Sequence, residues 1–122
     1  MQRGELYRVV HPPGDPRPAR VYLVVSRDGF LDARHSTAMV VPVYSAFHGL
    51  ETEVLVDETF GLKQSSSLHC DEVMSVRRTL LRDFVGLLPP EKMREGNGAL
   101  AIALDIAPED IEELGRRGSS NS

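Results

Sequence analysis

The chain has 122 residues, of which 41% are hydrophobic and 26% charged, and this composition indicates one globular domain that folds without disulfides or metals. Its net charge of −4 argues mildly against a nucleic-acid partner, and its single cysteine, Cys70, excludes an internal disulfide and favours a reducing compartment. Without an apolar run of about 18 residues or a signal-peptide pattern, the chain is expected to be cytoplasmic and to have no membrane partner.

Three apolar runs separated by turn residues predict strands in the first part of the chain. Glu5–Val10 alternates well enough for a first strand, and Val21–Val25 and Ala38–Tyr44 are apolar enough to be buried. Four prolines between residues 11 and 20 predict a loop before the second run. Pro42, inside the third run, predicts a bulge or a sheet edge.

The rest of the chain is expected to add strands and then helices. Glu53–Val56, Leu68–Val76 and Asp83–Leu88 have the composition of short strands. Pro89-Pro-Glu-Lys is typical of a helix start, and Pro108–Leu114 has the pattern of one further short helix. Five or six short strands followed by a helix predict a small, mostly antiparallel barrel.

Polar groups stand at the ends of the buried runs. Arg20 opens one run and Ser45 closes another, and a guanidinium and a hydroxyl fixed at strand ends form a plausible anion site. His69 and Asp71 are two residues apart, so they share a face if Leu68–Val76 is one strand. Together these four groups provide the chemistry for cleaving a phosphodiester without a metal.

Each of these residues also has an ordinary structural explanation. Arg20 and Ser45 are common residue types beside and at the end of a strand, Asp71 fits a loop anchor, and a lone histidine in a strand is more often structural. Cys70 alternates with its neighbours and should point into the core as a small hydrophobe. The histidines and the cysteine lack ligand spacing, so neither a metal nor a cofactor is expected.

Charge is unevenly distributed along the chain. Arginines gather in the first 34 residues, among them Arg8, Arg17, Arg20, Arg27 and Arg34. Five acidic residues lie among the last 18: Asp105, Glu109, Asp110, Glu112 and Glu113. A basic face with an acidic tail fits the same net charge, and a basic face is the feature that a nucleic-acid-binding protein requires.

The order and spacing of these motifs resemble the MazF/PemK toxin family of toxin–antitoxin endoribonucleases, over roughly residues 3 to 106. The matching segments are Arg3-Gly-Glu-Leu-Tyr7, Arg20 with Val24-Val-Ser26, Val40-Val-Pro-Val-Tyr-Ser45, Gly61-Leu62, Cys70-Asp-Glu-Val73, Gly86-Leu-Leu88 and Ala99–Leu104. The chain departs from the family pattern at Val21, where proline usually follows the arginine, and at Glu72, where glutamine is usual.

The resemblance implies a mainly β fold with a C-terminal helix, an SH3-like small barrel of the MazF/PemK/CcdB type, in residues 1–106. Residues 107–122 would be an acidic extension, a short helix followed by a disordered end. The protein would be a homodimer that cuts single-stranded RNA without a metal and leaves a 2′,3′-cyclic phosphate. A cognate antitoxin would block its RNA groove.

Residue by residue, the resemblance implies catalytic roles for Arg20, Ser45, Asp71 and His69, with Arg17-Pro18 as a competing match for the essential arginine. The residues expected to contact RNA are Arg17, Arg27, Arg34, His35, His48 and His11. Two other functions remain open. A CcdB-like toxin would use the same barrel to bind gyrase without catalysis, and an inactive barrel would only bind RNA or a partner protein.

Overall fold

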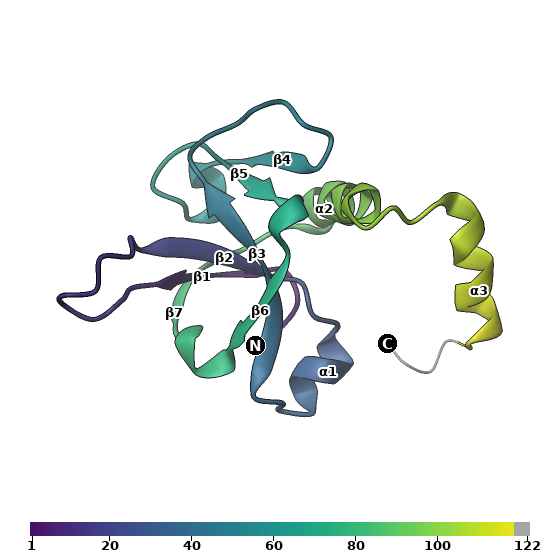
Figure 1. Cartoon of the computed structure of the whole chain (residues 1–122), viewed down its shortest axis with the longest axis horizontal. Coiled ribbons are helices and arrows are strands. Elements are labelled where there is room, and N and C mark those ends of the chain that lie inside the picture. The colour runs from purple at the N-terminus through teal and green to yellow at the C-terminus, as the bar shows by residue number, and fades with distance from the viewer. Residues whose placement is uncertain (119–122) are drawn as a thin grey trace.

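A computed structural model describes residues 1–118, which contain seven strands and three α-helices (Figure 1). The strands are β1 (Glu5–Val9), β2 (Arg20–Val24), β3 (Thr37–Tyr44), β4 (Glu53–Val56), β5 (Ser66–His69), β6 (Met74–Arg77) and β7 (Asp83–Leu87). The helices are α1 (Asp28–Asp32), α2 (Pro90–Ala103) and α3 (Ile111–Arg116), with 3-10 turns η1 (Glu58–Phe60), η2 (Cys70–Glu72), η3 (Arg78–Leu80) and η4 (Pro108–Asp110). No helix within this range is long and apolar enough to cross a lipid bilayer.

The described strands form one antiparallel sheet in the order β4-β5-β3-β2-β1-β7, and β6 also pairs with β3. The long strand β3 organises the sheet, because its first half pairs with β6 and its last two residues pair with β5. The predicted class is confirmed as a mainly antiparallel half-barrel with C-terminal helices.

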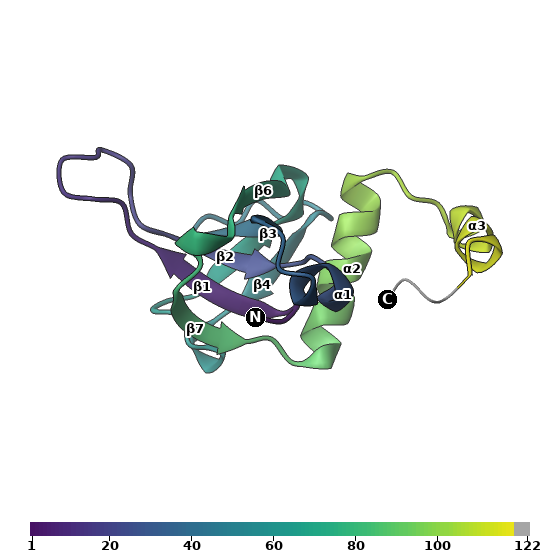
Figure 2. The same cartoon turned by 90° about the horizontal axis from the view of Figure 1, so that it is seen from below.

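Each face of the sheet has its own apolar core. One core contains Leu6, Leu23 and Leu68 and is covered by Met93 and Ala99 of α2, which lies alongside the sheet in Figure 2. The other core contains buried residues of β1, β2 and β3 together with a leucine of α1. Because side chains of a strand alternate between faces, every sheet strand that contributes to both cores is fixed in register.

Two glycines allow η1 to lie directly on β7. A side chain at Gly86 would collide with the carbonyl oxygen of Phe60, and one at Gly61, whose φ is +95°, would collide with the carbonyl oxygen of Val85. Only residues without a Cβ permit this approach of two backbones. The two positions are among those that carry the resemblance described above.

Two details of the predicted sheet are wrong. Leu68–Val76 is not one strand, because β5 ends at His69 and η2 turns the chain before β6 begins at Met74. Pro42 marks neither a bulge nor an edge, because β3 is an internal strand. The proline pairs with Tyr22 on β2 and falls where β3 changes its other partner from β6 to β5.

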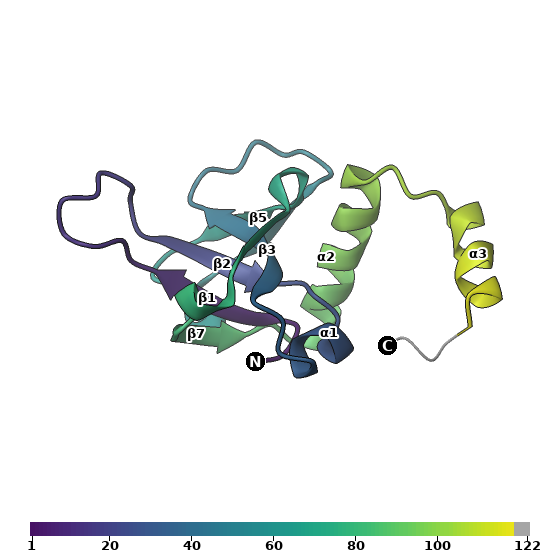
Figure 3. The same ribbon diagram turned by 60° about the horizontal axis from the view of Figure 1, so that its bottom comes forward.

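The segment after α2 extends away from the sheet (Figure 3). The expected short helix is present as η4 and α3 and continues to Arg116. The apolar side chains of Ile111 and Leu114 are 60% and 59% exposed, so α3 does not join either core. Of the end that was expected to be disordered, residues 119–122 lie outside the described residues.

Candidate functional site

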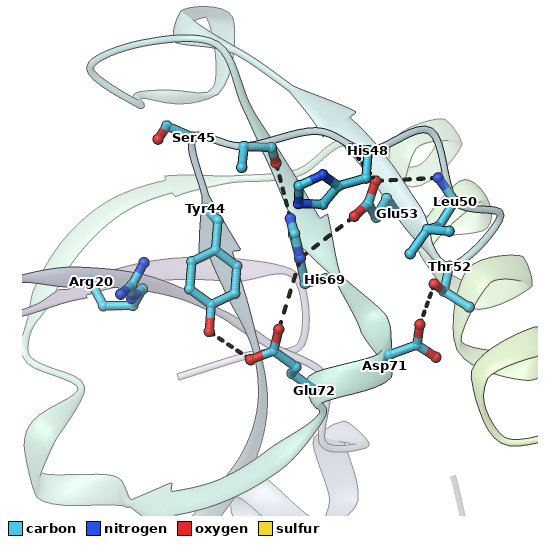
Figure 4. Close-up of a pocket in the computed structure, with 11 residues that line it drawn as sticks. Arg20, Tyr44, Ser45, His48, Leu50, Thr52, Glu53, His69, Asp71 and Glu72 are labelled. Atoms are coloured by element: carbon cyan, nitrogen blue, oxygen red, sulfur yellow. Dashed lines mark hydrogen bonds and ion pairs between the residues drawn. The ribbon is translucent and has the colours of Figure 1, made fainter.

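An open cavity of about 450 Å³ lies where β2 begins and where β3 and β5 end. All four predicted catalytic residues, Arg20, Ser45, His69 and Asp71, line it, and so does His48 (Figure 4). The cavity is also lined by residues that were not predicted to belong to a site: Tyr44, Ala46, Leu50, Thr52, Glu53 and Glu72. The cavity therefore combines cationic, hydroxyl, imidazole and carboxylate groups.

The guanidinium of Arg20 lies on an aromatic ring. Arg20 is the first residue of β2, and its Cζ is 4.2 Å from the centre of the Tyr44 ring at the end of β3. This cation–π contact orients the charge without consuming its N–H donors. Within residues 1–118 no carboxylate forms an ion pair with Arg20, so the donors remain available to an anion in the cavity.

Tyr44 is itself held on two sides. Its hydroxyl donates a 2.7 Å hydrogen bond to Oε1 of Glu72, and its ring meets the His69 ring edge-on at 4.6 Å. Partial burial, together with the hydrogen bond to Glu72, raises the pKa of Tyr44 above its usual value. The tyrosine therefore stays a neutral donor, and its orientation fixes the platform under Arg20.

The imidazole of His69 is held by hydrogen bonds at Nε2, and its Nδ1 faces two carboxylates. Nε2 lies 3.0 Å from the carbonyl oxygen of Ala46 and 2.9 Å from Oγ of Ser67, and a carbonyl oxygen only accepts, so Nε2 carries the proton. Nδ1 lies 3.7 Å from Glu53 and 3.9 Å from Glu72. Only 11% of the side chain is exposed. This geometry favours a positioning role for His69 over direct proton transfer.

A buried carboxylate, that of Glu53, lies next to the imidazole of His69. Only 2% of its side chain is exposed, and its Oε1 accepts the backbone N–H groups of His48 at 2.8 Å and Leu50 at 3.3 Å. Burial opposes ionisation, but these amide hydrogen bonds and the nearby His69 outweigh it, and the pKa of Glu53 lies below its usual value. The sequence feature that could have identified Glu53 is its position as the one charged residue of β4, at the start of an otherwise apolar strand.

Asp71 reaches the cavity from η2 and not from a strand. The expectation that it shares a strand face with His69 is therefore wrong, because the strand ends at His69. The Thr52 hydroxyl donates a 2.6 Å hydrogen bond to Oδ2 of Asp71, and the aspartate is otherwise exposed. Cys70 points into the core as expected, and its burial beside Asp71 raises the pKa of its thiol to about 11.

The other residues expected to contact RNA lie elsewhere. Arg17 lies in the proline-rich loop and forms an ion pair with Asp15 at 2.6 Å, so its charge is already compensated. Arg34 and His35 line a second cavity at the opposite end of β3. Neither His11, in the first loop, nor Arg27, beside α1, lines the Arg20 cavity.

In the part of the chain that the structure describes, no three His, Cys, Asp or Glu side chains gather closely enough to hold a metal ion. The groups that face the Arg20 cavity are hydrogen-bond donors, acceptors and one uncompensated cation. Such a set suits an anionic ligand whose negative charge lies next to a guanidinium and a hydroxyl.

Residues 2–104 match the family model described as "PemK-like, MazF-like toxin of type II toxin-antitoxin system". No curated protein sequence matches the chain. Three similar solved structures illustrate the fold. An endoribonuclease from Mycobacterial species, in complex with its cognate antitoxin, is 23% identical over 88% of this chain and 97% of that chain, with a TM-score of 0.73.

The Mycobacterium tuberculosis toxin MazF-mt6 is 24% identical over 84% of this chain and 98% of that chain, with a TM-score of 0.73. A MazE–MazF structure from Deinococcus radiodurans is 20% identical over 88% of this chain and 98% of that chain, with a TM-score of 0.71. At these identities the likeness shows the shared fold, which covers nearly the whole length of each related chain.

Proposed function

The chain belongs to the PemK-like, MazF-like toxin family of type II toxin–antitoxin systems, and on this basis we propose that it is a cytoplasmic endoribonuclease that cleaves single-stranded mRNA at a short sequence. The observation that carries the proposal is the Arg20 guanidinium, which Tyr44 orients and with which no carboxylate of residues 1–118 forms an ion pair, in an open cavity beside the Ser45 hydroxyl. The similar solved structure from Mycobacterial species is described as an endoribonuclease.

In the proposed reaction the RNA attacks itself. The 2′-oxygen forms a bond to the adjacent phosphorus, the bond from phosphorus to the 5′-oxygen breaks, and the products carry a 2′,3′-cyclic phosphate and a 5′-hydroxyl. Arg20 stabilises the charge that develops on the phosphoryl oxygens, because a guanidinium stays protonated and donates two parallel hydrogen bonds. Ser45 donates a hydrogen bond to the same phosphate and is not a nucleophile.

Two protons move in this reaction. We assign the proton of the 2′-hydroxyl to Asp71, which is exposed in the cavity and oriented by Thr52. The leaving 5′-oxygen takes its proton from His48, whose side chain is exposed, whereas Nε2 of His69 is hydrogen-bonded to the protein and only 11% of the His69 side chain is exposed. His69 acts as a positioning residue, since it contacts the Tyr44 ring on which Arg20 stacks.

The proposal is tested with purified protein and a long single-stranded RNA. We expect a small set of defined fragments, and the same fragments in EDTA, because every group in the proposed reaction comes from the protein or the substrate. DNA of the same sequence is the control and should remain intact. Growth arrest of cells that express the chain, with no cleavage of RNA, would instead favour the gyrase-binding alternative.

We further propose that the protein is a homodimer that a cognate antitoxin inactivates. Each copy leaves large apolar side chains 43% to 54% exposed on and beside the sheet, among them Met39, Met74, Leu80 and Phe84. Surfaces of this kind are commonly covered by a partner. Light scattering should give twice the chain mass of 13.5 kDa, and adding the antitoxin should stop RNA cleavage. A monomer mass at micromolar concentration contradicts the dimer.

A further inference from the structure

A second, larger cavity lies at the other end of β3. It measures about 660 Å³ and is lined by Arg34, His35, Ser36, Thr37, Arg77, Arg78 and Thr79. Three arginines, one histidine and three hydroxyl groups line it, and none of the carboxylates within the described residues does. Since Thr37 begins β3 and Tyr44 ends it, the two cavities lie roughly 23 Å apart at about 3.3 Å per strand residue.

The fold brings the three arginines together from distant parts of the sequence. Thr37 pairs with Arg77 across β3 and β6, which places the end of β6 beside the segment that follows α1. Arg78 is anchored, because its Nη1 donates a 2.5 Å hydrogen bond to the carbonyl oxygen of Leu31. Arg34 and Arg77 are exposed and form no ion pair with any of residues 1–118. The cavity thus holds one anchored guanidinium, that of Arg78, and two exposed ones, those of Arg34 and Arg77, that no carboxylate of residues 1–118 compensates.

Two further features mark this cavity: the backbone conformation of Arg34 and an exposed aromatic ring, His35, that stacks on Phe30. Arg34 has a φ of +57°, a left-handed conformation that is uncommon for a residue other than glycine. His35 is exposed and stacks on Phe30, with ring centres 4.1 Å apart and an angle of 15° between the planes. A supported, exposed ring beside arginines suits a nucleobase next to its phosphate. An acidic peptide would use the arginines but has no need of the ring.

We propose that this cavity is a second nucleotide-binding subsite for the RNA substrate, in which Arg34 and Arg77 contact phosphates and His35 stacks on a base. The inference rests on the proposed ribonuclease function. With about 3.4 Å per nucleotide, a stacked strand that ran directly along β3 would place about seven nucleotides between the two cavities. The subsite positions the strand through its backbone and through stacking, so it extends the contacted RNA well beyond the cleaved bond.

A length-dependent experiment tests the subsite. One RNA covers only the cleaved bond and its flanking nucleotides, and the other is extended on both sides by more than about seven nucleotides. For the wild-type protein kcat/KM should be higher on the long RNA. The advantage of the long RNA should fall about tenfold in His35→Ala, because base stacking is lost. Arg94→Ala removes an exposed arginine of α2 that lines neither cavity, and it should keep the full advantage.

The salt dependence of RNA binding is a second test, because a substitution that only disturbed the local structure would not change the number of phosphates contacted. Affinity for the long RNA, made non-cleavable by one 2′-deoxy sugar at the cut, is measured by fluorescence anisotropy at several salt concentrations. The slope of log K against log[salt] should decrease by about 0.7 in Arg77→Ala and again in Arg34→Asn, because each variant loses one phosphate contact. Asparagine is chosen at position 34 because it tolerates the left-handed backbone.

The outcomes separate the two proposals. If the wild-type protein cleaves neither RNA, the ribonuclease function itself fails. If it cleaves both RNAs, and the three variants keep both the length advantage and the salt slope, the second subsite is refuted while the function stands. Unchanged RNA binding with loss of antitoxin binding in Arg34→Asn and Arg77→Ala would also refute it, by assigning the cavity to the antitoxin.

Discussion

Replacing Arg20 with alanine should lower kcat/KM for RNA cleavage by about 10³–10⁵-fold, the range expected when an arginine that stabilises phosphoryl charge is removed. The side chain is half-exposed, and its contact with the Tyr44 ring is its only described side-chain interaction, so the fold should survive the change. The measurement is initial cleavage rates on one RNA, with circular dichroism spectra to verify folding. A folded variant within about tenfold of wild type would show that Arg20 is not catalytic.

Three further variants sharpen this result. Arg17→Ala addresses the competing match in the proline-rich loop and should have little effect, because Asp15 already compensates that charge. Arg20→Lys should restore only part of the rate, since an ammonium cannot donate two parallel hydrogen bonds to a phosphate. His69→Gln should lower kcat/KM about 10²-fold, which is more than Arg17→Ala and less than Arg20→Ala. The substitution removes the ring that packs against Tyr44 and so misplaces the guanidinium.

The positions of Arg20 and Ser45 at strand ends could be predicted from the sequence, because each borders a buried apolar run. Such runs have few alternatives to a central strand, so their ends are placed firmly even when the rest of the sheet is unknown. Strand β3 then holds Ser45 next to the Tyr44 ring on which Arg20 lies, and both residues line one cavity. Long, strongly apolar segments were thus the reliable part of the prediction.

The chain around His69 could not be predicted in the same way. Leu68–Val76 alternates like one strand, but the central strand β3 is long enough to pair with two short strands in succession, and η2 provides the turn between them. Whether one strand or two face β3 depends on the tertiary pairing and not on local pattern. This turn takes Asp71 off the strand face that it was expected to share with His69, and the Asp71 carboxylate instead accepts a hydrogen bond from Thr52.

Residues brought together only by topology were missed for a related reason. The partners of His69 include Glu53, which comes from the neighbouring strand β4 in register with it. In the second cavity, Arg77 of β6 and Arg78 of η3 were not predicted as site residues. Only the pairing of β3 with β6 brings them beside Arg34, which follows α1. Their common location follows from the register of the sheet, which a single sequence leaves undetermined.

A single 2′-deoxy sugar on the nucleotide 5′ of the cleaved bond should abolish cleavage at that bond. In the proposed reaction the 2′-hydroxyl is the nucleophile, and neither Ser45 nor buried Cys70, whose pKa is raised to about 11, would replace it. The matched control carries the 2′-deoxy sugar one nucleotide further downstream and should be cleaved normally, because binding loses one hydroxyl in both substrates but only the first loses the attacking group.

The products give an independent check on the same mechanism. Attack by the 2′-oxygen places the cyclic phosphate on the upstream fragment, so the downstream fragment must begin with a 5′-hydroxyl that polynucleotide kinase labels without prior phosphatase treatment. Attack by water on the opposite side of the phosphorus would leave a 5′-phosphate and would still proceed on the 2′-deoxy substrate. Either of those observations would exclude the self-attack mechanism and with it the role of Asp71 as the acceptor of the 2′-hydroxyl proton, even if Arg20 remained essential for cleavage.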